Sequence, residues 1–297
     1  MYDICCIGHI TLDKVVTPQA VKHMAGGTSF YFSSAIRHMD VSYTLVTSLA
    51  ESEMPTVEAL RAKGTEVHAS TCAHTVYFEN IYSGNQDHRT QRVLQKADPF
   101  TVEQLQGINA QIFHLGPLLA DDIPVSLIKE LSSRGRVSLD AQGYLRKVED
   151  KNVIPVDWPA KKEALQYIDI LKVNEHELEA LTGLTDIKKG ALVLADWGVK
   201  EVVITLGSMG SVIYAGGLFY NVPAYIPTAV VDATGCGDTY MAGYLYQRIK
   251  GASFQEAGEF AAAMASFKIE SSGPFTGTKE DVLNLLEVGD KTFAVYS

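Results

Sequence analysis

The feature that most limits the possible folds of this chain is an alternation of short buried strands with helical segments, which is clearest from residue 111 onwards. Val137–Asp140, Ile168–Val173 and Glu201–Leu206 are apolar runs of strand length, and helical patterns lie between them. Strands that are joined through helices and apolar on both faces are typical of a parallel sheet covered on both sides. We therefore predict an α/β fold, with a doubly wound, mainly parallel sheet flanked by helices.

The stretch from residue 75 to 95 departs from this alternation. Val76–Tyr82 alternates apolar and polar residues, residues 83–87 are rich in turn formers, and Gln91–Leu94 follows as a short strand. This pattern predicts a β-hairpin with one exposed face. Together with residues of about 12–18, we expect it to form a small β layer within a single domain spanning 1–297. A lid over a cleft and an ordinary edge hairpin both fit this layer.

Composition narrows the class of protein. The 297 residues are 46% hydrophobic and 20% charged, which is ordinary for a globular chain. A net charge of −10 argues against nucleic acid or an anionic membrane as the main partner. The four cysteines form no C-x-x-C pair, the first residues lack a signal-peptide pattern, and no apolar run approaches the ~20 residues of a membrane span. We expect a cytoplasmic protein without structural zinc.

The stretch from Val231 to Gly243 carries the clearest chemical signal. A β-branched start leads through Gly235-Cys236-Gly237 to Asp238, where a helix is expected to begin. Backbone N–H groups at a helix N-terminus can hold an anion, and a carboxylate beside them can take a proton from a group that attacks it. This combination is what phosphoryl transfer to a hydroxyl requires. The plainer alternative is an aspartate that only caps the helix.

Several competing motifs are missing. No G-x-G-x-x-G follows the first strand, which ends at Gly8, and no G-K-[ST] sequence exists, which disfavours a nicotinamide dehydrogenase and a Walker-type ATPase. Ser208 lacks the G-x-S-x-G context of serine hydrolases. The histidines form no metal-binding pair, and we expect His9 and His114 to pack in the core or at its rim.

Four further groups stand where strands are expected to end or helices to begin. They are Asp13, Gly26-Gly27, Asn174-Glu175-His176-Glu177 and Thr205-Leu206-Gly207-Ser208-Met209-Gly210. Ligands in open α/β sheets gather at the carboxyl ends of the strands. Each group also has an ordinary structural explanation: a solvated loop aspartate, a tight turn, a helix N-cap and a β-turn, respectively.

These pieces, in this order, resemble the ribokinase-like (PfkB) family of sugar kinases over nearly the whole chain. The resemblance implies that Asp238 is the general base and that the N–H groups of Gly235, Cys236 and Gly237 form the anion hole. It also implies a nucleotide site, a metal site, a substrate site and a possible monovalent cation site. The nucleotide site would contain Asn174, Thr205, Gly207, Gly210, Ala263 and Ser266, and Glu177 would hold Mg²⁺ through water together with Asn174. The substrate site would contain Asp13, Gly26 and Gly27. The possible cation site would contain Asp232, Thr234 and the loop near Ser271–Gly273.

The chain departs from the family pattern at two positions. Cys236 stands where the family usually has alanine, and cysteine keeps the backbone N–H of the anion hole. Tyr31 replaces an asparagine that is common in ribose- and fructose-type members, and this change bears on the substrate. Other segments look closer to the inositol-phosphorylating members, among them Glu79-Asn80-x-Tyr82 and the run from Asp140 to Arg146. By this resemblance, Asn80 and Arg146 join the substrate-binding residues.

The resemblance thus implies an ATP- and Mg²⁺-dependent kinase, with K⁺ as a possible further cofactor. Its substrate would be a small sugar or a cyclic polyol such as myo-inositol. A nucleoside or hydroxymethylpyrimidine kinase of the same fold stays open, and so does a catalytically silent sensor that binds sugar or nucleotide. Pairing of two chains through the lid is a further expectation, because hairpin edges invite strand addition.

Overall fold

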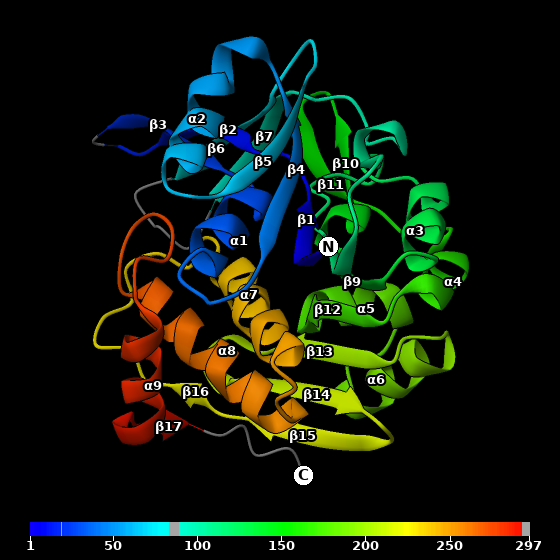
Figure 1. Cartoon of the computed structure of the whole chain (residues 1–297), viewed down its shortest axis with the longest axis vertical. Helices are drawn as coiled ribbons and strands as arrows, with labels where there is room; N and C mark the ends of the chain where they lie inside the picture. Colours follow the sequence, from blue (N-terminus) through cyan, green and yellow to red (C-terminus); the bar gives the residue numbers. More distant parts are fainter. Residues whose placement is uncertain (19, 83–88, 293–297) are drawn as a thin grey trace.

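The computed structural model describes residues 1–18, 20–82 and 89–292 (Figure 1). Its main feature is a nine-stranded sheet with the order β15-β14-β13-β12-β9-β8-β1-β4-β5. Neighbouring strands are parallel from β5 to β13, and β14 and β15 are antiparallel additions. The strands are β1 (Tyr2–Ile7), β4 (Tyr43–Leu49), β5 (Glu66–Thr71), β8 (Ala110–Leu115), β9 (Arg136–Asp140), β12 (Ile170–Asn174), β13 (Glu201–Thr205), β14 (Ser211–Ala215) and β15 (Leu218–Val222).

Helices cover both faces of this sheet (Figure 1). One face carries α1 (Thr28–Ile36), α2 (Met54–Ala62), α7 (Cys236–Ile249), α8 (Phe254–Ile269) and α9 (Lys279–Val288). The other carries α3 (Val125–Ser132), α4 (Lys161–Ala164), α5 (Glu175–Thr182) and α6 (Ile187–Asp196). None of the described helices has both the length and the apolar character needed to cross a lipid bilayer.

The alternation of side chains along each strand explains the two layers. In β1, Ile4 and Cys6 face the core under α1 and α7, whereas Cys5 and Ile7 face the core under α3 and α5. A strand with apolar residues on both faces gains stability only where both faces are covered. The predicted doubly wound α/β sheet is confirmed, and both cysteines are buried.

A second sheet lies beyond the carboxyl ends of the main strands (Figure 1), with the order β10-β11-β7-β6-β2-β3. It contains the two expected segments, as β2 (Thr11–Val16) and as β6 (Val76–Tyr82) with β7 (Arg89–Gln95). The expected turn at 83–87 lies outside the described residues. Three strands were not anticipated: β3 (Val21–Gly26), β10 (Arg146–Glu149) and β11 (Asn152–Pro155). A short pair, β16 (Ala224–Tyr225) with β17 (Lys291–Thr292), completes the sheets.

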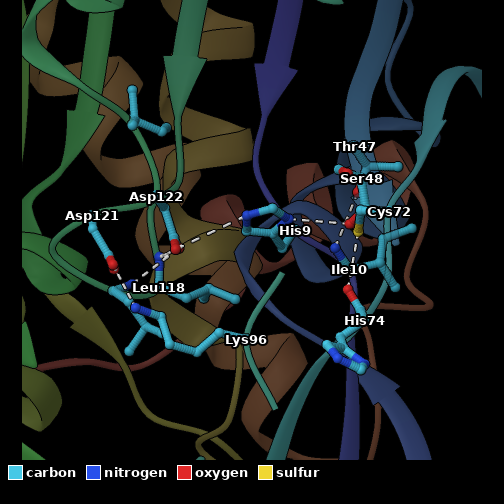
Figure 2. A network of polar contacts seen from close by, with 12 residues as sticks. His9, Ile10, Thr47, Ser48, Cys72, His74, Lys96, Leu118, Asp121 and Asp122 are labelled. Carbon is cyan, nitrogen blue, oxygen red and sulfur yellow. Dashed lines mark hydrogen bonds and ion pairs between the residues drawn. The ribbon is translucent and has the colours of Figure 1, made fainter. Parts of the chain in front are cut away.

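A buried histidine joins the two sheets where β1 leads into β2. Figure 2 shows His9 between Asp122, at 4.0 Å from its Nε2, and the Ser48 carbonyl, at 3.1 Å from its Nδ1. The imidazole stacks on Phe100 with ring centroids 4.4 Å apart. Asp122 accepts the backbone N–H groups of Leu118 and Leu119, which pack against the second sheet. The prediction that His9 packs in the interior is confirmed, and its contacts fix the path of the chain between the sheets.

Candidate active site

The carboxyl ends of three neighbouring strands meet the first turn of α7. The register pairs Lys172 of β12 with Asp140 of β9, and Asn174 with Thr205 of β13. A Cβ atom placed on Gly237 would lie 3.3 Å from the Lys172 Nζ, so the start of α7 rests directly on this lysine. The topology therefore brings residues from four distant parts of the chain to one edge of the sheet, as the sequence predicted for Asn174, Thr205 and Asp238.

Gly235 forms the entry to α7 in a conformation that only glycine adopts easily. Its φ is 78°, in the left-handed region, and a Cβ atom there would lie 2.2 Å from the Tyr31 ring. Tyr31 lies on α1 and is almost fully buried. Tyr31 thus packs beneath the glycine turn, and this contact joins α1 to the start of α7.

The first turn of α7 presents backbone N–H groups that have no acceptor within the helix. The N–H of Gly237 and that of Asp238 belong to this turn, whereas the N–H of Cys236 donates to the Ala233 carbonyl at 3.2 Å. The helix dipole adds partial positive charge at the same place. An anion that approaches the start of α7 therefore meets the N–H groups of Gly237 and Asp238, whereas the N–H of Cys236, which was expected in the anion hole, is already engaged.

Beneath this turn lies a buried cluster of charges. The Lys172 Nζ is 3.0 Å from Asp140 Oδ2 and 3.8 Å from Glu177 Oε2, and the three side chains are at most 9% exposed. Burial by itself would lower the pKa of Lys172, but the negative charges of Asp140, Glu177 and Asp238 raise it above its ordinary value. The lysine is therefore a permanent positive charge under the anion-binding turn.

Asp238 has the electrostatics of a base that works near neutral pH. Burial, and then the negative charge of Asp140, raise the pKa of Asp238 to about 7. Lys172, the Thr28 hydroxyl that hydrogen-bonds to the carboxylate, and Arg146 oppose this rise. A carboxylate with a pKa near the operating pH can both accept a proton and release it, as general-base catalysis requires.

Asn174 and Glu177 form a reciprocal cap at the start of α5. The Glu177 carboxylate accepts both the backbone N–H and the side-chain amide of Asn174, at 2.8 and 2.9 Å, while Asn174 Oδ1 accepts the Glu177 N–H. Burial raises the pKa of Glu177, and Lys172 opposes this. Among the described residues there is no group of three or more His, Cys, Asp or Glu arranged to hold a metal directly. These residues fit a Mg²⁺ ion that arrives with phosphates and is contacted through water.

Asp13, Gly26 and Gly27 lie together on the opposite side, where β2 pairs with β3. A Cβ atom on Gly26 would lie 2.5 Å from Asp13 Oδ2, and one on Gly27 would lie 2.5 Å from the His9 carbonyl. The Thr11 hydroxyl donates to Asp13 Oδ1 at 2.6 Å. Gly26 thus allows close packing against the aspartate, and Gly27 allows close approach to the backbone at the start of β2. Thr28 follows directly and reaches Asp238, so the chain connects Asp13 to the base.

Asn80 and Arg146 approach from the second sheet. Asn80 pairs with Val15 and Asp13 with Phe78, so by the two-residue repeat of strands Asn80 and Asp13 share a face. Phe78 lies on the same face and packs against Leu118 and Leu119, which follow strand β8 of the nine-stranded sheet. The Asn80 side chain accepts a hydrogen bond from Gln91, and Arg146 lowers the pKa of both Asp238 and Glu177, which places its charge at the site.

The segment from Thr205 to Gly210 turns tightly against β16. Gly207 and Gly210 have φ values of 57° and 90°, and a Cβ on Gly210 would lie 2.1 Å from the Val222 carbonyl. Ser266 donates to the Tyr225 carbonyl at 2.7 Å, and Ala263 is fully buried in α8. Beside this turn and before the α7 motif lie four exposed apolar side chains: Met209, Ile226, Val230 and Val231.

The possible cation site begins at Asp232, three residues before Gly235. The Asp232 carboxylate accepts the Thr234 N–H at 2.9 Å and lies 3.6 Å from the Nζ of Lys268. Lys268, Lys172 and Thr28 were not recognised as site residues from the sequence. For Lys172 a signal existed, because a single lysine inside the apolar run Ile170–Val173 is costly unless it meets a carboxylate.

Comparisons with known proteins agree with this geometry. In sequence, the chain is 26% identical over 268 residues to a cytidine kinase of Thermococcus kodakarensis, covering 86% of this chain and 92% of that protein. It is 35% identical over 188 residues to a ribokinase of Arabidopsis thaliana, covering 60% of this chain and 46% of that protein.

In structure, the chain superposes on a pyrophosphate-dependent myo-inositol-1 kinase, in a variant whose substitutions convert it into a myo-inositol-3 kinase. The TM-score is 0.85, and the identity is 29%, with 96% of this chain and 98% of the other chain covered. It also shares the fold of the Arabidopsis thaliana ribokinase complexed with ribose and ATP, with a TM-score of 0.82 and 24% identity over 97% and 99% of the two chains. Residues 63–281 match the profile of the family described as pfkB family carbohydrate kinase. The chain therefore belongs to the pfkB family of carbohydrate kinases.

Proposed function

We propose that this protein transfers the terminal phosphoryl group of Mg²⁺-bound ATP to a hydroxyl group of a small cyclic polyol or sugar. The observation that carries the proposal is the position of Asp238. Its carboxylate has a pKa raised to about 7 and lies in the first turn of α7, above the buried ammonium of Lys172. The carboxylate that accepts the proton and the turn that binds the anion are then close enough to act on the same reaction.

In this mechanism the Asp238 carboxylate takes the proton of the substrate hydroxyl while the hydroxyl oxygen forms a bond to the terminal phosphorus. The bond from that phosphorus to the bridging oxygen breaks, and ADP carries the electron pair away. The N–H groups at Gly237 and Asp238, with the Lys172 charge below them, stabilise the negative charge of the transferring group. Asn174 and Glu177 would contact the Mg²⁺ of the nucleotide through water, and the ion would supply positive charge to the phosphates.

The substrate side favours a molecule with several neighbouring hydroxyl groups. Asp13 offers a carboxylate, Asn80 an amide from the same face of the second sheet, and Arg146 a guanidinium near the base. Tyr31 occupies the position of the usual asparagine but is buried under Gly235, so it offers no amide to a furanose. The structural similarity to a myo-inositol kinase also supports a cyclic polyol. We propose the second sheet as the lid of this site, and its edge strand β3 as the place where a second copy would pair.

The phosphoryl donor is proposed to be a nucleotide because of the exposed apolar residues near the site. Ile226, Val230 and Val231 are more than half exposed, and they lie between the Thr205–Gly210 turn and α7. Apolar side chains left open beside a phosphate site suit the flat face of a purine base. Pyrophosphate, the donor named for one structural relative, has no group that would cover them.

The test is a matrix of donors and acceptors. ATP, GTP and pyrophosphate are each combined with myo-inositol, other cyclic polyols, ribose, fructose, cytidine and adenosine, and phosphorylated product is measured directly. We expect the highest kcat/KM with ATP and a cyclic polyol. A kcat/KM highest with pyrophosphate would contradict the donor, and one highest with ribose or fructose would contradict the polyol.

A nucleoside kinase is the second candidate, because the similarity to a cytidine kinase spans 92% of that protein. In the same matrix it would appear as phosphorylation of cytidine or adenosine in preference to any polyol. Failure to phosphorylate every acceptor, with nucleotide binding intact, would instead favour the silent sensor. The raised pKa of Asp238 argues against that outcome, since a binding protein gains nothing from a poised base.

The pH dependence of kcat/KM follows from Asp238. Because the base acts only as carboxylate, and its pKa is raised to about 7, we expect kcat/KM to fall about tenfold for each pH unit below 7. Above pH 8 it should be level until other groups titrate. Initial rates between pH 5 and 9 at constant ionic strength measure this limb. A kcat/KM that stays level down to pH 5 would contradict a base whose pKa is raised to about 7.

The glycine turn gives another prediction. We expect Gly235→Ala to lose most turnover, because φ of 78° costs a non-glycine residue about 1–2 kcal/mol and the new Cβ would overlap the Tyr31 ring. Gly251→Ala is the matched control: its φ is 81°, but its Cβ would meet nothing within 4 Å. It should lose similar backbone stability and keep its turnover. Thermal melting and steady-state rates of both variants separate strain from overlap at the site.

A further inference from the structure

We propose that the ammonium group of Lys268 takes the place of the monovalent cation beside the anion-binding turn, so that this protein needs no added K⁺. The inference rests on the proposed kinase function and concerns the same site. The resemblance to the family implied a cation held by Asp232, Thr234 and the loop near Ser271–Gly273. In the structure, that position already contains a positive charge.

Lys268 lies in the last turn of α8, and its side chain has no exposed surface. Its Nζ donates to the Asp232 carbonyl at 2.8 Å and to the Ser271 carbonyl at 3.3 Å, and it lies 3.6 Å from Asp232 Oδ2. An ammonium group has three N–H donors and no acceptor. Two carbonyl oxygens therefore accept from the ammonium, and the Asp232 carboxylate adds an ion pair, so that oxygens of two segments surround it.

These contacts decide whether an added cation fits. A potassium ion needs oxygen ligands, and the oxygens that would supply them here already accept from Lys268. A second positive charge within a few ångströms of a buried ammonium would also be repelled strongly, because little water is present to screen it. The residues present thus do not fit a bound K⁺, and the lysine supplies the same unit of charge from within the chain.

The position of this charge explains how it would act on the reaction. Asp232 accepts the N–H of Thr234 at 2.9 Å and that of Gly273 at 3.5 Å, so its carboxylate joins the two segments that Lys268 also contacts. The N–H groups of Val231 and Asp232 both donate to the Ile269 carbonyl at the end of α8. Gly235 follows three residues later. Lys268 is therefore a positioning residue: it holds the segment that leads into the anion-binding turn.

A buried ion pair is strongly destabilised when one partner is removed, because the other charge remains without compensation. Removing the Lys268 ammonium should leave Asp232 and two carbonyl oxygens in a vacated space. That space is then suited to a small cation. This gives a test in which a gain of cation dependence, and not only a loss of function, is expected.

The first measurement is thermal melting without any substrate, in K⁺, NH₄⁺, Na⁺ or choline at equal ionic strength. We expect wild type to melt at the same temperature in all four. We expect Lys268→Ala to melt lower in choline and to regain stability in K⁺ or NH₄⁺. Lys268→Met, which fills the space with an apolar chain, should melt lower in every salt. Lys189→Ala removes an exposed lysine of α6 and should behave as wild type.

The second measurement is turnover with the acceptor found in the substrate matrix. Wild type should be equally active in the four salts, and Lys268→Ala should lose activity about ten- to one-hundredfold in choline and recover it in K⁺. Stimulation of wild type by K⁺ but not by Na⁺ would overturn the proposal, and this holds even if no variant folds. A Lys268→Ala variant that K⁺ does not rescue, or one that is unaffected in choline, would overturn it as well. Because melting needs no substrate, failure of the kinase assignment is distinguishable from failure of this inference.

Discussion

Replacing Asp238 with asparagine is expected to lower kcat by at least ~10²–10⁴-fold while nucleotide binding is retained. The amide keeps the shape of the side chain and can still contact the Thr28 hydroxyl, but it cannot take a proton from the substrate. Turnover and the dissociation constant for ATP, measured on the same preparation, separate these effects. A variant with near-normal turnover would remove Asp238 from the role of base.

Asp186→Asn is the matched control, because Asp186 also lies at the start of a helix and accepts the Lys189 N–H at 3.0 Å, but far along the chain from the site. Asparagine caps a helix about as well as aspartate, so turnover should not change.

Stability gives an independent check on Asp238. Its pKa is raised from 3.8 to about 7, so the stability of the protonated form is lost as pH rises through about 7. Asp238→Asn should therefore melt above wild type at pH 8, and this difference should shrink towards pH 5.

The fold was predictable because its strands are apolar on both faces and lie between helices. The predicted strands Val137–Asp140 and Glu201–Leu206 agree within one residue at each end with β9 and β13. Strands β10 and β11 were missed because they are short, and because the residues that connect them, Asp150 and Lys151, adopt φ values of 47° and 68° without a glycine to indicate the turn. β11 pairs with β7 and β10 pairs with β11, so a tertiary contact attaches both strands to the sheet.

The candidate site was predictable where one short stretch carries both the turn and the reactive group. Gly235 to Asp238 is such a stretch, and its conformation follows from glycine chemistry. Lys268 was missed because a lysine in the last turn of a helix is normally solvated and favoured there by the helix dipole. Only the return of the chain at Asp232, 36 residues earlier, buries it. Sites assembled from several elements are thus recognised in part from sequence, through the member that has a local signature.

Removal of Lys172 should have the second largest effect. This lysine neutralises Asp140 and Glu177 in the interior and lowers the pKa of Asp238. Lys172→Met leaves two buried carboxylates without their partner, which typically costs about 3–5 kcal/mol of stability. Lys200→Met is the matched control, since the Lys200 side chain is 75% exposed where it pairs with Asp169, and a pair with an exposed ammonium contributes about 0–1 kcal/mol.

The kinetic result expected for Lys172→Met is a displaced pH profile. Without the ammonium, the pKa of Asp238 should rise further above its ordinary value, so the acid limb of kcat/KM moves to higher pH. Each pH unit by which the limb moves lowers kcat/KM at pH 6 about tenfold. Adding Asp140→Asn removes the carboxylate that raises the pKa of Asp238, and the double variant should regain stability and shift the limb back. A lysine that only supported the fold would lower stability and leave the limb in place. Melting curves and kcat/KM from pH 5 to 9 for the single and double variants therefore distinguish a positioning charge from a structural one.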